Sequence, residues 1–304
     1  MKLPVLLVFF NRRNTLESVL ECIRRYKPHK LFLSSDGPRP SVKGESLLVD
    51  DIRSYVLASI DWDCSVECHF HDSNLGCKVA VNEAIQWFFS KEERGIILED
   101  DIVPSDYFFT FCENALDIYK DNKEIGSIGG RCEVGVGSSP NSNDTFFSSK
   151  FFCWGWASWS DRILGLDTNI SSNSDVKKDM LNSLVYPENL MVKGMYGLVE
   201  SKQVNSWAYE YDLNFRFKGQ LQLLPSHNMV TNIGFQTEGA HSSASSFDRV
   251  VRYDDFLPVC RHVSIAYPSS EFIADYAKYV YKSTFRLYLF SLIKYLKFIR
   301  KLFK

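Results

Sequence analysis

The sequence has little of what marks non-globular proteins. Of its 304 residues only 16 are glycine and 10 are proline, which excludes a collagen-like repeat, and 14% are aromatic, more than a disordered chain carries. The eight cysteines form no CxxC pair and show no Cys/His spacing typical of zinc, so we expect buried, reduced thiols. No apolar run reaches the length of a membrane span, and the short one after Pro4 predicts a buried strand rather than a signal peptide. We therefore expect a cytoplasmic protein.

Charge is distributed unevenly along the chain. Residues 278–304 contain eight Lys or Arg and no Asp or Glu, so the rest of the chain keeps 27 of the 35 basic residues against all 37 acidic ones. An acidic body argues against a general nucleic-acid binder, which needs a basic surface. The basic tail indicates a separate surface that binds something anionic.

The first hundred residues alternate between strand and helix patterns. Strands are predicted over 5–10, 30–34, 65–71 and 95–98. Helices are predicted over 15–26, 47–60 and 78–89, because apolar residues there recur at helical spacing. This alternation predicts an α/β fold with a mostly parallel central sheet flanked by helices, and ligands bind such sheets at the carboxyl ends of the strands.

The second half is less regular. We expect a helix over 105–122, a strand ending at Gly129-Gly130, a strand over 221–225, and an aromatic segment over 151–159. Loops are predicted over 135–149 and 228–241, and an exposed excursion over 166–183. Because there is no internal repeat and no linker, the simplest division is one domain over 1–265 followed by a tail over 266–304.

The strongest chemical signal is three consecutive carboxylates, Glu99-Asp100-Asp101, directly after a predicted buried strand. Such neighbours repel one another unless a cation or hydrogen-bond donors offset their charge. Carboxylate oxygens suit Mg²⁺ or Mn²⁺, which in turn bind diphosphate oxygens. The alternative is a solvated acidic turn, which the position between a buried strand and a helix start disfavours.

The stretch 96–109, IILEDDIVPSDYFF, resembles nucleotide-sugar-dependent glycosyltransferases with the GT-A fold. In particular it resembles the N-acetylglucosaminyltransferase I group and its bacterial relatives that build surface polysaccharide. The resemblance includes a strand followed by Asn11-Arg12 and the sequence SSDG at 34–37. Downstream, GWASW, the segment around Trp207, PSHNMVTNIGF and AHS are similar to the bacterial branch.

This resemblance implies a Rossmann-like GT-A domain with a nucleotide-binding part over about 1–130 and an acceptor part over about 131–265. It implies a metal-dependent, inverting transferase that moves a sugar from a nucleoside-diphosphate donor, such as a UDP-sugar, to a polysaccharide or lipid-linked glycan during bacterial cell-surface glycan synthesis. The implied cofactor is Mn²⁺ or Mg²⁺.

The resemblance also implies roles for nucleotide-binding residues. Arg12 would contact the phosphate or the nucleotide, since a fixed guanidinium suits that role. Asp36 would accept a hydrogen bond from the ring N–H of the base, and Asp100 would hydrogen-bond the ribose or the sugar. Lys78 could reach phosphate, although a solvated helix lysine is the alternative.

Further residues are assigned to the metal and the donor sugar. Asp101 would ligate the metal, and Glu99 would hold hydroxyls of the donor sugar. His241 would lie near the metal or the diphosphate, with a surface histidine as the alternative. Trp156, with its neighbours Trp154 and Trp159, could stack on sugar rings, or the three could form part of an aromatic core.

An inverting transferase needs a general base beside the acceptor hydroxyl, and the resemblance places an acidic base near Trp207. Bacterial relatives tend to carry Asp directly after this Trp, whereas this sequence has Ala208. In an extended strand Glu210 and then Asp212 would point the same way as position 208. We therefore predict Glu210 as the general base, with Asp212 as the second candidate.

The tail carries its own pattern. Its apolar residues recur at spacings of three and four on one helical face and its lysines on another, over residues 279–304. A basic amphipathic helix of this kind predicts peripheral binding to an anionic membrane, here the inner face of the cell membrane. A helix docked on its own body or on a partner is the alternative.

Two other functions remain open. A nucleotidyltransferase also uses an α/β fold and carboxylate-bound metal, but it usually carries a glycine-rich phosphate loop that FNRRNTLES lacks. A catalytically impaired glycan-binding or scaffold protein of the same fold is the second alternative, because of Ala208.

Overall fold

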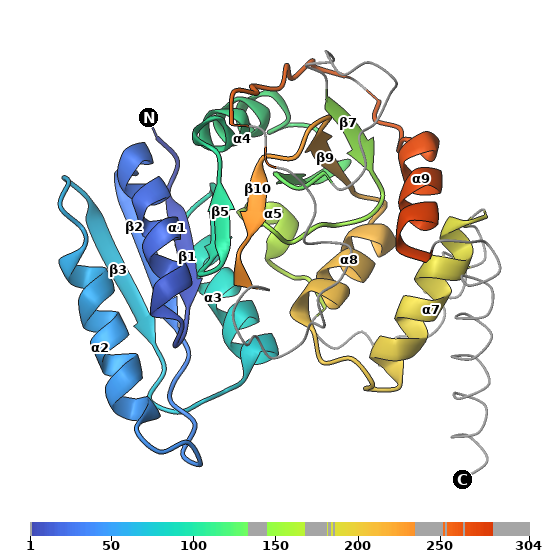
Figure 1. Cartoon of the computed structure of the whole chain (residues 1–304). Coiled ribbons are helices and arrows are strands. Elements are labelled where there is room, and N and C mark those ends of the chain that lie inside the picture. The colour runs from blue at the N-terminus through green and yellow to red at the C-terminus, as the bar shows by residue number, and fades with distance from the viewer. Residues whose placement is uncertain are drawn as a thin grey trace, which may run out of the picture.

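A computed structural model describes residues 2–132, 145–167, 181, 184, 186–234, 252, 254–263 and 265–281. Its centre is an eight-stranded sheet with the strand order β3-β2-β1-β4-β8-β6-β9-β7, flanked by helices (Figure 1). Four of the seven neighbouring pairs in this sheet are parallel: β3 with β2, β2 with β1, β1 with β4, and β6 with β9. The predicted α/β fold with a mostly parallel central sheet is confirmed.

The first half follows the predicted alternation closely. The strands are β1 (Val5–Phe9), β2 (Lys30–Ser35), β3 (Ser65–Phe70) and β4 (Arg94–Glu99). The connecting helices are α1 (Arg13–Tyr26), α2 (Glu45–Ala58) and α3 (Cys77–Lys91). Side chains of β1 alternate between the two faces: Leu7 packs in one core cluster with residues of α1 and α2, and Leu6 packs in another with residues of α3. Helices therefore cover both faces of the sheet.

Strands of the second half extend the same sheet. β8 (Trp156–Trp159) runs antiparallel to both β4 and β6 (Ile125–Gly129), so β4 and β6 point in the same direction. β9 (Leu221–Pro225) is parallel to β6. The carboxyl ends of β1, β2, β4, β6 and β9 consequently meet at one edge of the sheet. This is the edge at which the sequence predicts ligand binding.

Two predicted loops contain strands. β7 (Thr145–Ser148) pairs with β9 inside the region 135–149, and β10 (Val230–Asn232) pairs with β5 (Ile102–Pro104) inside the region 228–241. The loop prediction is wrong for these residues because backbone hydrogen bonds to a distant strand form here, although the local sequence favours a loop. The β5–β10 pair brings the chain around residue 232 next to the carboxylates that follow β4 (Figure 1).

Among the described residues, the other helices with given bounds are α4 (Asp106–Ile118), α5 (Ser160–Ile163), α7 (Glu188–Glu200), α8 (Trp207–Phe217) and α9 (Ser270–Tyr281). The tail predicted to begin at residue 266 includes α9, whose Phe272 is fully buried and packs against the rings of Phe146 and Phe152 of the body. That boundary is therefore too early.

Residues 282–304, which hold most of the predicted membrane-binding helix, lie outside the described residues. Among the described helices, none is long and apolar enough to cross a membrane.

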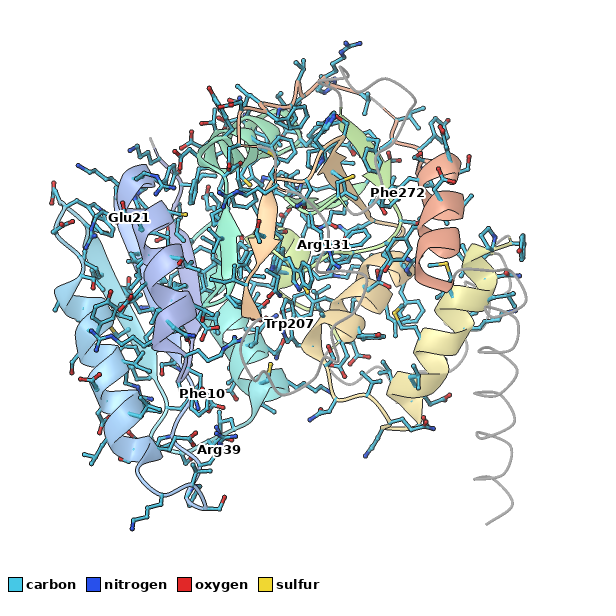
Figure 2. The ribbon with its side chains drawn as sticks, in the orientation of Figure 1. Phe10, Glu21, Arg39, Arg131, Trp207 and Phe272 are labelled. Atoms are coloured by element: carbon cyan, nitrogen blue, oxygen red, sulfur yellow. The ribbon has the colours of Figure 1, made fainter. Side chains whose placement is uncertain are left out.

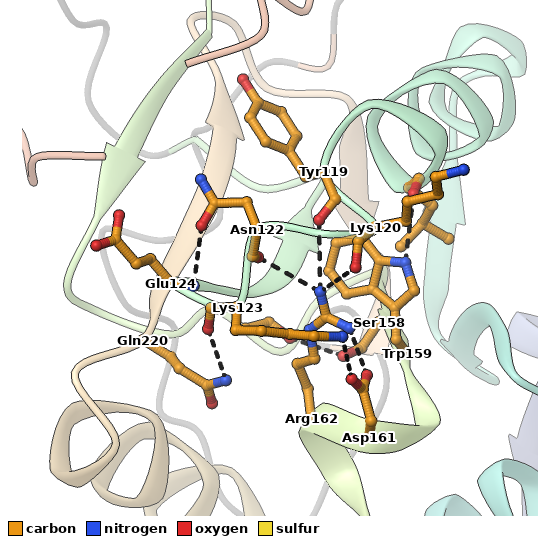
Figure 3. Close-up of polar contacts among 12 residues, drawn as sticks. Tyr119, Lys120, Asn122, Lys123, Glu124, Ser158, Trp159, Asp161, Arg162 and Gln220 are labelled. Atoms are coloured by element: carbon orange, nitrogen blue, oxygen red, sulfur yellow. Dashed lines mark hydrogen bonds and ion pairs between the residues drawn. The ribbon is translucent and has the colours of Figure 1, made fainter. Parts of the chain in front are cut away.

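The turn between α4 and β6 is held by a buried arginine (Figure 3). Arg162, 2% exposed, donates to the main-chain oxygens of Lys120 at 2.6 Å and of Tyr119 and Asn122 at 3.4 Å. Its guanidinium also lies 4.3 Å from the Trp159 ring centroid. A single side chain thus satisfies carbonyls that the end of α4 leaves unpaired.

All eight cysteines are free thiols, as predicted. Cys22, Cys112 and Cys132 are buried, but Cys68 and Cys77 are exposed, so the prediction of burial holds only in part.

Candidate active site

The three carboxylates lie at the end of β4, on the carboxyl edge of the sheet. Asp100 is buried, and one of its oxygens accepts from the main-chain N–H of Phe10 at 3.2 Å. The other oxygen accepts from Arg12. Asp100 therefore ties the end of β4 to the end of β1.

Arg12 bridges two of the carboxylates. Besides Asp100, its guanidinium donates to Asp101 Oδ2 at 2.9 Å. Only two of the five N–H groups of Arg12 are used in these bonds, and its side chain is 33% exposed. The remaining N–H groups can meet an anion that approaches this edge.

The cluster carries more negative charge than Arg12 offsets. Burial, followed by the charges of Asp101 and Asp100, raises the pKa of Glu99 to about 8. Burial also raises the pKa of Asp100 to about 6, although Arg12 opposes this shift. Burial lowers the pKa of Arg12, but the two aspartates outweigh it and the net change is a rise. Within the described part of the chain, no donor hydrogen-bonds to the Glu99 carboxylate or to Asp101 Oδ1.

The segment after β10 closes against this cluster. The main-chain N–H of Ile233 donates to the carbonyl oxygen of Asp101 at 2.9 Å, and Asn232 accepts from the N–H of Gly234 at 2.8 Å. A Cβ added at Gly234 would lie 2.8 Å from Arg12 Nη1 and would overlap the Asp101 carboxylate. The absence of a side chain at Gly234 therefore allows this close approach to Arg12 and Asp101.

Asp36 lies at the end of β2 and is buried. Its carboxylate accepts four hydrogen bonds, from the main-chain N–H groups of Gly37, Leu75 and Gly76 at 2.8–2.9 Å and from Asn74 Nδ2 at 2.9 Å. A carboxylate has about four lone-pair sites, so these bonds fill them. Asp36 holds the loop before α3, and its predicted contact with a nucleotide base stays a prediction.

Lys78 and Glu210, predicted for separate roles, contact each other. Lys78 Nζ on the first turn of α3 donates to Glu210 Oε1 on the first turn of α8 at 2.6 Å. Burial raises the pKa of Glu210, and Lys78 opposes this rise without cancelling it. The start of α3 lies at the carboxyl edge of the sheet, because the N–H of Gly76, two residues before Lys78, donates to Asp36 after β2 at 2.9 Å.

The register argument that linked Ala208, Glu210 and Asp212 is wrong, because residues 207–217 form helix α8 rather than a strand. Residues two apart on a helix point about 200° from each other. Asp212 is 1% exposed and accepts from the N–H of Phe151 at 2.5 Å and from Arg216 Nε at 3.0 Å. Asp212 is thus a buried structural carboxylate and not a base. Ala208 packs at the border of a hydrophobic cluster.

The tryptophans predicted to stack on sugars are mainly core residues. Trp156 is 0% exposed and packs near Trp207, Tyr211 and Phe151, so its predicted contact with the donor sugar is wrong. Trp159 is 4% exposed. Only Trp154 is half-buried, with Arg131 over its ring at 3.3 Å. From the sequence alone, three tryptophans around a glycine are equally compatible with a sugar-stacking surface and with a hydrophobic core.

No group of three or more His, Cys, Asp or Glu side chains among the described residues has the arrangement of a metal site. His241, the second predicted metal ligand, lies outside the described residues. Asp101 nevertheless keeps one carboxylate oxygen without a hydrogen bond from the described chain. Mg²⁺ typically takes one or two protein carboxylates and completes its shell with water and phosphate. The donors present fit a metal that binds together with a diphosphate.

Sequence reasoning missed two basic residues: Arg131, at the same sheet edge, and Lys150, just after the end of β7. Arg131 follows β6 and is 9% exposed, and Lys150 precedes β8. Burial lowers the pKa of Lys150. Single basic residues beside an aromatic run form no motif, so no sequence signal could have selected them.

Comparison with known proteins adds little. No family model matches the chain, and no curated protein matches it. A solved structure of apo UDP-glucose pyrophosphorylase aligns over 75% of this chain and 93% of its own, with a TM-score of 0.34 and 8% sequence identity. Similarity this low indicates nothing about the function of this chain.

Proposed function

We propose that this protein is a metal-dependent, inverting glycosyltransferase that moves a sugar from a nucleoside-diphosphate donor to a polysaccharide or lipid-linked glycan. A UDP-sugar is the first candidate for the donor. The observation that carries the proposal is the Glu99–Asp101 cluster at the carboxyl edge of the sheet, bridged by Arg12 and closed by Gly234. Excess buried negative charge beside a partly exposed guanidinium suits a metal-bound diphosphate better than a solvated acidic turn.

Each residue of the cluster has a role in this proposal. Arg12 directs its unused N–H groups to the diphosphate and stabilises the charge that develops there as the sugar leaves. Asp100 holds Arg12 against β1, and Glu99 hydrogen-bonds hydroxyls of the donor sugar. Asp101 would hold Mg²⁺ or Mn²⁺, which would supply further positive charge to the leaving diphosphate.

Glu210 is proposed to act as the general base for the acceptor hydroxyl. Its raised pKa suits proton abstraction, and Lys78 holds the carboxylate in one position. A purely structural link between α3 and α8 would use the same contact. The two roles differ in what Glu210→Gln removes: the base role predicts a loss of transfer of at least about 100-fold with donor binding unchanged.

The proposed function is tested by thermal shift with a panel of UDP, GDP, CMP and dTDP sugars, with and without Mn²⁺. Stabilisation by one nucleotide sugar that requires Mn²⁺ is the expected result. The absence of any Mn²⁺-dependent shift across the panel would overturn the proposal. Formation of a nucleoside triphosphate when pyrophosphate is added would instead show a nucleotidyltransferase.

Ala208→Asp tests whether the chain is catalytically impaired. Position 208 lies in the first turn of α8, where a carboxylate is favoured by about 0.3–1 kcal/mol, so the variant is expected to fold. If Glu210 is the base, wild type transfers sugar and Ala208→Asp does so at a similar rate. Donor binding without turnover in both proteins would favour a glycan-binding or scaffold role.

Membrane binding by residues 279–304 remains a proposal from sequence alone. Flotation with anionic and neutral liposomes, with and without these residues, tests it. Equal flotation of both proteins would exclude a membrane role for the tail.

A further inference from the structure

Arg12 combines a fixed backbone with a side chain that can move. It directly precedes α1, and its carbonyl oxygen accepts from the N–H of Leu16 at 3.3 Å and from the hydroxyl of Thr15 at 3.2 Å. Its guanidinium, by contrast, hydrogen-bonds among the described residues only to Asp100 and Asp101. One-third of the side chain is exposed, so water can reach it. The backbone of Arg12 is thus anchored independently of the two carboxylates.

The two carboxylates hold Arg12 in different ways. Asp100 is the more deeply buried, with a side chain that is 4% exposed against 13% for Asp101. Its carboxylate is also tied to the sheet, because it accepts from the N–H of Phe10 at the carboxyl end of β1 (Figure 2). Asp101 is tied through its main chain, whose carbonyl oxygen accepts from Ile233, while its carboxylate meets Arg12 Nη1 at 2.9 Å. The bond from Arg12 to Asp101 is therefore the more readily exchanged of the two.

The Arg12–Asp101 pair places a cation on the carboxylate that the proposed function gives to the metal. Oδ2 of Asp101 already accepts from Arg12 Nη1. A guanidinium and a divalent metal on one carboxylate repel each other, because both cations contact the same group. Binding of the metal alone therefore requires Arg12 to leave Asp101, or it proceeds against the charge of Arg12.

A diphosphate changes this balance. Phosphate oxygens accept from a guanidinium as carboxylate oxygens do, and they can pair with it through two parallel hydrogen bonds. Arg12 can therefore leave Asp101 without losing a partner, while it keeps its bond to Asp100. Asp101 is then free for a metal that the diphosphate also binds.

We propose that Arg12 holds the carboxylate of Asp101 until a diphosphate accepts its guanidinium, so that metal and diphosphate bind with positive coupling. This inference rests on the proposed function and adds the order in which its site is assembled. An arginine that only binds the diphosphate would leave the affinity for the metal alone unchanged when it is removed. An arginine that competes for Asp101 would weaken that affinity, so its removal would strengthen it.

Mn²⁺ binding without any diphosphate is the decisive measurement. Free Mn²⁺ is followed by electron paramagnetic resonance in titrations of the full chain as wild type, Arg12→Gln and Arg12→Lys. Arg12→Gln removes the charge but keeps an N–H donor for Asp100, and Arg12→Lys keeps the charge. Arg13→Gln is the matched control, since Arg13 pairs with the exposed carboxylates of Glu17 and Asp51. We expect Arg12→Gln to bind Mn²⁺ at least about 10-fold more tightly than wild type, with the other two variants close to wild type.

Inorganic pyrophosphate serves as the diphosphate probe, because it requires no choice of base. Its affinity is measured by titration calorimetry with and without saturating Mn²⁺. In wild type we expect Mn²⁺ to tighten pyrophosphate binding by about 5- to 150-fold, the usual range of coupling between two sites. In Arg12→Gln this coupling should be smaller, since only the direct contact between metal and pyrophosphate remains.

Urea unfolding shows whether each variant is folded and gives a second readout. Mn²⁺ alone should raise the midpoint of Arg12→Gln more than that of wild type, because a ligand of the folded state stabilises it. Equal or weaker Mn²⁺ binding by Arg12→Gln would overturn the inference. If Arg12→Gln does not fold, the wild-type titrations decide: coupling between Mn²⁺ and pyrophosphate supports the inference, and independent binding overturns it.

The outcomes also separate this inference from the proposed function. If a nucleotide sugar gives a Mn²⁺-dependent thermal shift while Arg12→Gln binds Mn²⁺ no more tightly than wild type, only the inference fails. If Arg12→Gln binds Mn²⁺ more tightly while no nucleotide sugar gives a shift, sugar transfer fails and the exchange at Asp101 stands. If no protein binds Mn²⁺ with or without pyrophosphate, both fail.

Discussion

Gly234→Ala is expected to separate the function of the carboxylate cluster from the stability of the fold. The new Cβ would lie 3.0 Å from Asp101 Cβ and 2.8 Å from Arg12 Nη1, and it would overlap the Asp101 carboxylate. Ordinary contacts between carbon atoms are about 3.5–4.0 Å long. Because Asp101 and Arg12 are side chains that can rotate, they are the groups that will move, and the Arg12–Asp101 hydrogen bond will be lost.

The effect on stability should be small. Arg12 is one-third exposed, so loss of its ion pair with Asp101 costs at most about 1 kcal/mol. Gly234 does not adopt a left-handed backbone, so alanine gains about 0.4–1 kcal/mol from the reduced entropy of the unfolded chain. The two terms nearly cancel. By contrast, a shift of about 1 Å in a group that positions substrate can reduce the rate about 100-fold.

Urea unfolding and the Mn²⁺-dependent thermal shift with nucleotide sugar are the two assays. Gly197→Ala is the matched control, since a Cβ there meets nothing within 4 Å, and it should be slightly more stable than wild type with unchanged donor binding. We expect Gly234→Ala to unfold near the wild-type midpoint and to lose most of the donor-induced shift. A normal shift in this variant would refute the assignment of Asp101 and Arg12 to the donor site.

Three further predictions concern buried polar groups. Arg216→Met leaves Asp212 and Glu188 without their shared cation. It should lower the free energy of unfolding, measured in urea, by about 3–5 kcal/mol. A change below about 1 kcal/mol would contradict the buried pairing. Asp36→Asn replaces an acceptor oxygen by an NH₂ donor that faces the N–H groups of the 74–76 loop. It should lower the free energy of unfolding in urea by about 2 kcal/mol. Asp50→Asn, at a largely exposed carboxylate, is the control. Arg162→Met leaves three carbonyl groups without their donor and should lower the melting temperature by several degrees, whereas Lys123→Met, in the same turn but exposed, should not.

The sequence predicted the first half of the fold well because each element there carries its own pattern. β1 and β4 are continuous apolar runs, and α1 shows an apolar stripe that faces the sheet. α8 could not be predicted in this way, because its residues from Glu210 to Arg216 are all buried, and a helix without an exposed face shows no period. The strand register used for Glu210 and Asp212 failed for that reason.

The candidate site was predictable where the chemistry is local. The cluster Glu99-Asp100-Asp101 was recognisable because three like charges are adjacent in the sequence. Its partner Arg12 follows β1, the strand that pairs with β4. Contacts between distant segments were not predictable: nothing in the sequence links Lys78 to Glu210. Trp156 was misassigned because an indole serves equally well in a core and on a sugar.

The position of β8 has a consequence for how this chain could be divided. Its residues Trp156 to Trp159 fill the place between β4 and β6, so a fragment that ended near residue 130 would expose the β4 backbone from Arg94 to Ile97 as an open edge. Open apolar edges promote aggregation by pairing with other chains. The proposed donor and acceptor halves are therefore not separable modules, and any recombination of donor and acceptor specificities with a second enzyme must exchange loops on the carboxyl edge rather than halves of the chain.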